Sequence, residues 1–114
     1  MMLRTYGRTT LGVWPPPVVA AIRDRQSFTT GGSLRGEAGT VPSYVRTGRL
    51  EGAALDQWRN DRPYVDYCVW SYGTPIGWHC HGPGLERWVT NVDSYSHTTT
   101  RHQGLVQLAI SLAY

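Results

Sequence analysis

The fold is decided by residues 64–92, which read YVDYCVWSYGTPIGWHCHGPGLERWVTNV. Aromatic and β-branched side chains, which favour strands, are concentrated in three runs, at 64–70, 75–81 and 85–92. The two segments between these runs, Ser-Tyr-Gly-Thr and Gly-Pro-Gly, carry residues that chains use to turn. The pattern predicts three antiparallel strands joined in a meander.

Alternation along the second of these strands predicts which of its side chains face the core. Ile76, Trp78 and Cys80 fall on one side, and His79 and His81 fall on the other. An apolar side opposite two imidazoles predicts that both histidines are exposed and that they flank one core thiol.

A helix is predicted to close the chain. Thr99 or Thr100 can cap it, and Thr100 with Gln103 fits the capping box, in which each side chain bonds the backbone N–H of the other residue. The apolar face of this helix would cover the meander and would consist of Leu105, Leu108, Ala109 and Leu112.

The first half of the chain is predicted to hold two short helices among irregular segments. Pro15 to Pro17 can open the first helix, at residues 18–26, and the second helix covers residues 50–60. We predict one α+β domain over residues 1–114, with an irregular and helical part at 1–63 and the sheet with its C-terminal helix at 64–114. Its architecture is a small three-stranded antiparallel meander packed by that helix.

The composition of the 114 residues excludes several classes of protein. No run of about 20 apolar residues occurs, so no membrane-spanning helix is expected. Two cysteines are too few for a disulfide framework, and the three prolines at 15–17 interrupt the apolar core that a signal peptide needs. We predict a cytoplasmic protein with reduced thiols. All eleven basic residues are arginine, which GC-rich coding explains, and the net charge of +3 permits contact with nucleic acid.

The cluster His79-Cys80-His81 invites a metal interpretation. On a strand its histidines point to one face, as in zinc sites built on a His-x-His pair, and His97 or His102 would have to supply a third ligand. Alternatively, the two cysteines could face each other across the hairpin and share a metal with a histidine. No Cys-x-x-Cys or His-Glu-x-x-His spacing supports either arrangement. We expect no metal and no cofactor; a metal, if one bound, would use Cys68, His79 and His81.

Catalytic motifs are not found in the sequence. Asp93, Ser94, Ser96 and His97 are neighbours along the chain, but a nucleophile, its base and an orienting carboxylate have to meet in space. The chain has no Gly-x-Ser-x-Gly elbow, no Walker loop and no dinucleotide fingerprint. We therefore expect a protein that is not an enzyme.

Arginines together with aromatic side chains suggest binding of nucleic acid. Single strands bind when bases stack on aromatic rings and arginines contact the phosphates. One face of the sheet could carry such a surface, built from Tyr64, Trp70, Tyr72, Trp88, Arg62, Arg87 and Arg101. The start of the last helix, at residues 98–102, adds hydroxyls, free N–H groups and a cation that suit an anion.

Two segments carry a distinctive pattern, SYGTPIGW at residues 71–78 and YSHTTTRHQ at residues 95–103. They resemble a family of uncharacterised proteins carried by phages, plasmids and related mobile elements, which pairs a Ser-Tyr-x-Thr-Pro-Ile-Ala-Trp hairpin with a Tyr-Ser-x-Thr-Thr-Ser-x-His-Gln segment. Here Gly77 replaces the alanine and Thr100 the last serine. Residues 27–36 look like the Phe-x-x-Gly-x-Leu-x-Gly stretch that these proteins often carry.

The resemblance implies a source, an actinobacterial phage, and it supplies no catalytic residues. Small phage proteins of this kind often bind and redirect a host protein, or handle nucleic acid. We predict a non-enzymatic accessory protein that binds a host bacterial protein in the host cytoplasm, away from membranes, with nucleic-acid binding as the alternative; the oligomeric state is left open. The candidate binding residues are Tyr72, Arg87, Trp88, Tyr95, Ser96, Thr98, Thr99, Arg101, His102 and Gln103.

Overall fold

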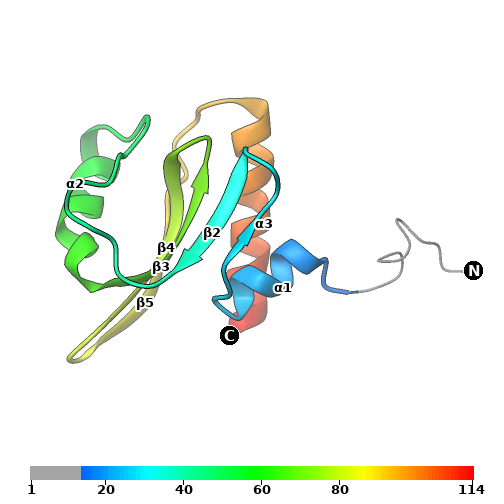
Figure 1. Ribbon diagram of the computed structural model, residues 1–114, viewed down its shortest axis with the longest axis horizontal. Helices are drawn as coiled ribbons and strands as arrows, with labels where there is room; N and C mark the ends of the chain where they lie inside the picture. The colour runs from blue at the N-terminus through cyan, green and yellow to red at the C-terminus, as the bar shows by residue number, and fades with distance from the viewer. Residues whose placement is uncertain (1–13) are drawn as a thin grey trace, which may run out of the picture.

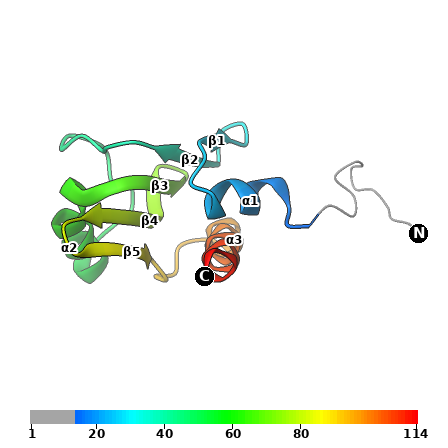
Figure 2. The same cartoon turned by 90° about the horizontal axis from the view of Figure 1, so that it is seen from below.

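The computed structural model describes residues 14–114, which form an antiparallel five-stranded sheet with helices on both faces (Figure 1, Figure 2). The order of the strands in the sheet follows their order in the chain. The strands are β1 (Phe28–Thr29), β2 (Leu34–Ala38), β3 (Val65–Ser71), β4 (Thr74–Gly82) and β5 (Leu85–Thr90). The helices are α1 (Pro17–Arg23), α2 (Gly52–Asp61), the short 3₁₀ helix η1 (Arg62–Tyr64) and α3 (His97–Ala113). None of these described helices is long and apolar enough to cross a membrane.

The α+β class and the meander of β3, β4 and β5 with its C-terminal helix are confirmed, but the sheet has five strands and not three. The additional strands, β1 and β2, form a hairpin in the half of the chain that was predicted to be irregular and helical. In β2, buried Leu34 and Gly36 alternate with exposed Arg35 and Glu37. This hairpin is stable as sheet because β2 pairs with β3 along its whole length.

Two apolar clusters fill the two sides of the sheet. The cluster under α1 and α3 contains Val19, Ile22, Leu34, Tyr67, Val69, Ile76, Val106 and Ala109. The cluster under α2 and the loop that precedes it contains Val41, Leu50, Trp58, Val65, Cys68, Trp70, Trp78 and Cys80. The sheet is therefore buried on both faces, and the two predicted helices of the first half pack on opposite faces of it.

Two register shifts interrupt the pairing of β3 with β4. One lies between Val65 and Tyr67, and the other lies where β4 has Ile76 as an extra residue opposite the bond between Val69 and Trp70. An extra residue turns the side chains beyond it to the other face. Ile76 consequently packs on the α3 side, whereas Trp78 and Cys80 pack on the α2 side. The predicted common face of Ile76, Trp78 and Cys80 is wrong.

The prediction of two exposed histidines on β4 is correct for His81 and wrong for His79. The side chain of His81 is 64% exposed, whereas that of His79 is 2% exposed. His79 is covered because the α3 side of the sheet also carries Trp88, whose ring meets the imidazole edge to face at 5.2 Å between centroids. The alternation could not show that both sides of this strand are covered.

The N-cap of the C-terminal helix lies three residues before the earlier of its two predicted caps. Ser96 is the N-cap, and its hydroxyl accepts the N–H of Thr99 at 3.1 Å. The predicted caps, Thr99 and Thr100, therefore lie inside α3. The buried face of the helix consists of Thr99, Gln103, Val106 and Ala109, so the predicted apolar face is rotated. Of the predicted residues, Leu105 and Leu108 are half-buried and Leu112 is exposed.

Candidate functional site

The ten candidate binding residues separate into two groups in the structure. Eight of them lie around the turn between β3 and β4, where α3 begins, and they are Tyr72, Tyr95, Ser96, Thr98, Thr99, Arg101, His102 and Gln103. The other two, Arg87 and Trp88, lie on the edge strand β5. The structure therefore defines two candidate surfaces and not one.

At the turn, a chain of hydrogen bonds joins β3 to the first turns of α3. The hydroxyl of Ser71 lies 3.0 Å from Oγ1 of Thr99 and 2.8 Å from Nδ1 of His102. Ser71 is 1% exposed and Thr99 is 4% exposed. Desolvation, and secondarily the charge of Arg101, lower the pKa of His102, so its imidazole is neutral near pH 7. A buried hydroxyl is a poor nucleophile, because a substrate in solvent cannot reach it. The contact of Ser71 with Thr99 and His102 instead anchors α3 to the sheet.

Gln103 and Tyr95 hold the segment between β5 and α3 in place. The amide of Gln103 donates to the carbonyl oxygens of Asn91 (2.6 Å) and Asp93 (3.0 Å). The amide of Asn91 donates to Oη of Tyr95 (2.9 Å) and to the carbonyl of Pro75 (3.3 Å). Since Gln103 is buried and its amide nitrogen donates to two carbonyl groups of the protein, its role is structural, and it is not available as a binding residue.

Tyr72 and Arg101 are the large side chains of this group that face solvent. Tyr72 is 60% exposed and has a φ of +51°, a backbone conformation that bulky residues rarely adopt. One side of its ring lies against the imidazole of His102, with 6.2 Å between the ring centroids. The turn thus presents an exposed aromatic ring in a strained position.

The single aromatic and basic face that we expected for nucleic acid does not form. Trp70 is 2% exposed, in the cluster under α2. Trp88 packs on the α3 side, whereas Arg87 reaches Asp61 of α2 on the other side of the sheet. Residues adjacent on one strand point to opposite faces, so Arg87 and Trp88 could not share a face.

Three side chains of β5 contact residues of other elements. Nη2 of Arg87 donates to the buried carboxylate of Asp61 at 2.6 Å. The ring of Trp88 meets that of Tyr67 edge to face, at 5.9 Å between centroids. Oε1 of Glu86 lies 3.0 Å from Nδ1 of His81. These contacts hold the edge strand in one position. Asp61, which directly follows the helix predicted at residues 50–60, was not among the predicted site residues.

The outer side of β5 is an open strand edge. In an antiparallel pair, residues alternate between those whose N–H and C=O face the neighbouring strand and those whose groups point away. The N–H of Asn91 donates to Ile76 of β4 (3.0 Å), and the register is unbroken back to Leu85, so the odd-numbered residues face β4. The N–H and C=O groups of Glu86, Trp88 and Thr90 therefore point outward, where no described strand pairs with them. Figure 2 shows β5 as the last strand of the sheet.

The opposite edge of the sheet is short and partly closed. β1 has two residues, and beyond it the hydroxyl of Ser27 accepts the N–H of Ala38 in β2 at 2.9 Å. Natural proteins blunt exposed edges by such means because open edges recruit other chains. The contrast singles out β5.

The residues considered for metal binding do not converge on one site among the described residues. Nδ1 of His79 lies 2.7 Å from Oδ1 of Asp66, and its Nε2 lies 3.3 Å from Arg25. Cys68 and Cys80 are free thiols buried in the α2 cluster, and burial raises the pKa of both, that of Cys80 to about 11. Within residues 14–114, no three histidine, cysteine or acidic side chains gather as a metal would need.

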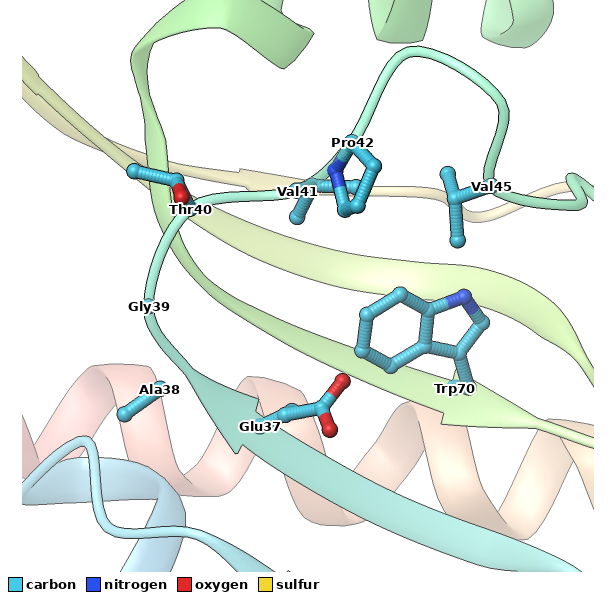
Figure 3. Close-up of a pocket in the computed structure, with 8 residues that line it drawn as sticks. All are labelled: Glu37, Ala38, Gly39, Thr40, Val41, Pro42, Val45 and Trp70. Atoms are coloured by element: carbon cyan, nitrogen blue, oxygen red, sulfur yellow. The ribbon is translucent and has the colours of Figure 1, made fainter.

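A cavity of about 300 Å³ lies between β2 and the loop that leads to α2 (Figure 3). Its walls include the carboxylate of Glu37, the apolar side chains of Val41, Pro42 and Val45, and the indole of Trp70. Nε1 of Trp70 is the one buried side-chain nitrogen or oxygen of the described residues without a hydrogen-bond partner. Figure 3 shows this nitrogen on the side of Val45. The guanidinium of Arg35 already covers the indole, 4.1 Å from the ring centroid.

Comparison with known proteins places the chain in one family. Residues 18–108 match the model of a family of unknown function, DUF8033, and the chain belongs to that family. No curated protein and no solved structure matches it. The match includes all five strands and most of α3, so it covers both candidate surfaces. The origin from a phage stays a prediction.

Proposed function

We propose that this is a non-enzymatic binding protein and that it holds an extended segment of a partner protein along β5. The observation that carries the proposal is the row of outward-facing backbone groups at Glu86, Trp88 and Thr90. A partner strand can add to such an edge through main-chain hydrogen bonds. The partner in this proposal is a host bacterial protein in the host cytoplasm, in keeping with the resemblance to proteins of mobile elements.

The fixed position of β5 supports this proposal. Binding to a mobile strand costs the free energy of ordering it, whereas a strand already held in place avoids that cost. Arg87 and Trp88 hold β5 from opposite faces of the sheet through Asp61 and Tyr67. They would therefore act as positioning residues in binding, and the hydrogen bonds to the partner would come from the backbone.

Exposed side chains near both ends of β5 could contribute to recognition of a partner, in addition to the backbone groups of its open edge. Val92 follows β5 by two residues and is 67% exposed. At the other end of the strand, exposed Glu86 is charged. Side chains of an added strand meet their neighbours in pairs across the new ladder. The proposed partner segment thus has an apolar residue at the Val92 end and a polar or basic residue at the Glu86 end.

Capture from a host lysate with two variants tests the proposal. Thr90→Pro removes an outward N–H without removing a bond to β4, and Thr90→Ala keeps that N–H and serves as the matched control. Circular dichroism first shows that both variants are folded. We expect one host protein retained from nuclease-treated lysate by the wild type and by Thr90→Ala, and lost with Thr90→Pro. Equal retention by both variants, or retention abolished by nuclease, contradicts the proposal.

A further inference from the structure

Two hollows meet at Gly48, on the loop that packs against the β3–β4 turn. The first, about 580 Å³, is lined by Val45, Arg46, Thr47, Gly48, Tyr72 and Gly73. The second, about 330 Å³, is lined by Gly48, Arg49, Leu50, Glu51, Ser94 and Tyr95. Each hollow therefore combines one arginine with one tyrosine. We call the two together the Gly48 groove.

The loop is fixed to the turn at the point where the two hollows meet. The N–H of Arg49 donates to Oγ1 of Thr74 at 2.8 Å. Gly48 has a φ of +56°, and a Cβ on it would lie 2.6 Å from the carbonyl oxygen of Gly73. Only glycine fits this conformation and this approach. Arg46 and Arg49 are therefore held on either side of a fixed contact.

The charges of the groove favour an anion. Neither Arg46 nor Arg49 forms an ion pair with a carboxylate of the described residues. The guanidinium of Arg49 lies over the ring of Tyr95, 5.3 Å from its centroid. Glu51 is the one carboxylate that lines the groove, and it is exposed. Removal of its charge should therefore strengthen the binding of an anion.

The fold alone does not explain why a tyrosine occupies position 72 of the turn. Tyr72 and Gly73 both have positive φ, +51° and +83°, as the two central residues of a type I′ turn do. Asparagine is preferred at the first of these positions, and a tyrosine there costs conformational energy. One side of its ring lies against His102, and the residue is 60% exposed. A base could stack on the free side.

From the Gly48 groove we infer a second binding site, for single-stranded nucleic acid. Arg46 and Arg49 would contact successive phosphates, while Tyr72 would stack on a base. Such a site is sequence-tolerant, because every base has a π-face. It differs in every residue from the edge strand β5, so it does not depend on the proposed protein partner.

Fluorescence anisotropy with a labelled 15-nucleotide oligo(dT) or oligo(U) tests the inference. We expect binding that weakens as salt rises, because phosphate neutralisation releases counterions. The slope of log K against log salt concentration should fall in magnitude by about 0.7 for each arginine changed to glutamine at 46 or 49. Arg23→Gln, which makes the same change of charge on α1, is the control and should leave affinity unchanged. Glu51→Gln should bind more tightly.

Substitution of Tyr72 separates binding from folding. Tyr72→Asn relieves the strained turn, so it should raise the melting temperature and yet weaken oligonucleotide binding by about tenfold or more. Tyr72→Trp should retain the affinity. Thr90→Pro should also retain it, which keeps this test distinct from that of the β5 edge.

Four results would overturn the inference. One is the absence of binding at micromolar protein in low salt, and another is unchanged affinity in Tyr72→Asn. The third is inorganic polyphosphate that competes as well as the unlabelled oligonucleotide, because the groove would then recognise phosphate without bases. The fourth is duplex DNA that binds as tightly as the single strand, because paired bases are not free to stack on Tyr72.

Discussion

Oγ of Ser71, at the end of β3, lies 2.8 Å from Nδ1 of His102, in the second turn of α3. These residues belong to the two segments through which the sequence resembles proteins of mobile elements. The segments are 31 residues apart at this contact and meet inside the fold, where they join the C-terminal helix to the central strand. Their common pattern of hydroxyl, imidazole and amide groups thus has a structural use.

Acidification should weaken the protein through His102. Its pKa is lowered in the folded state from the ordinary value of 6.5, chiefly by desolvation, so the unfolded chain binds the proton more readily. The contribution of His102 to stability is therefore complete above pH 6.5 and is lost as pH falls from there through the folded-state pKa, at no more than about 1.4 kcal/mol per pH unit.

Urea denaturation of the wild type and of His102→Gln between pH 5 and 7.5 measures this effect. The free energy of unfolding of the wild type should fall more steeply towards low pH than that of the variant. Parallel curves would show that His102 has the same pKa in both states.

Replacement of Asp61, a buried carboxylate at the end of α2, should destabilise the protein. Its carboxylate accepts from Nε1 of Trp78 (2.9 Å) and from Nη2 of Arg87 (2.6 Å), and the residue is 3% exposed. Asp61→Ala leaves a buried indole N–H without a partner, so we expect a loss of about 2–4 kcal/mol of stability. Asp56→Ala, at an exposed acid on the same helix, should change stability by less than about 0.5 kcal/mol. Equal effects in chemical denaturation would contradict this account of Asp61.

Two glycines should respond to alanine in opposite directions. A Cβ on Gly77 would lie 2.6 Å from Cγ1 of Val106 in α3, whereas one on Gly104 meets no atom within 4 Å. We expect Gly77→Ala to destabilise by about 1–3 kcal/mol through overpacking. Gly104→Ala should stabilise the helix by about 0.5–1 kcal/mol. In thermal denaturation, Val106→Ala combined with Gly77→Ala should cost less than the sum of the single changes; strict additivity would mean that the two sites do not touch.

The two thiols should be inert in the folded protein. Cys68 and Cys80 are both fully buried, and burial raises the pKa of each, so little thiolate forms at pH 8. We expect no reaction with a thiol-specific reagent in buffer and two thiols per chain in denaturant. Rapid labelling of either cysteine in buffer would show that the α2 cluster opens.

The meander could be predicted because residues 64–90 form one continuous stretch in which runs of strand-forming, alternating side chains are separated by residues typical of turns. The β1–β2 hairpin could not, since β2 is short, carries Arg35 and Glu37, and exists through its pairing with β3. The extra residue at Ile76 does not alter the alternation of residue types in the sequence. Ile76 and Trp78 were therefore predicted to share a face, although they lie on opposite faces of the sheet. Several hydroxyls precede α3, and any could cap it; Ser96 is the cap while Thr99 bonds Ser71.

Most of the features that define the candidate surfaces could not be predicted from the sequence. The open edge of β5 consists of backbone groups, which no residue type reveals, although Arg87 and Trp88 on that strand were singled out. Arg46 and Arg49 were not predicted as binding residues, because they are far from Tyr72 and Tyr95 in the sequence and the fold alone brings them together. Tyr72 carried the one available signal, a tyrosine before the glycine of a tight turn.

Amide hydrogen exchange of the free protein, followed residue by residue by NMR, tests the open edge of β5 most directly. The N–H groups of Arg87, Val89 and Asn91 face β4 and should exchange slowly, whereas those of Glu86, Trp88 and Thr90 should exchange much faster. An alternating pattern of this kind confirms an edge available to a partner strand. Uniformly slow exchange along β5 would show that the edge is already covered, and would contradict its proposed role in binding.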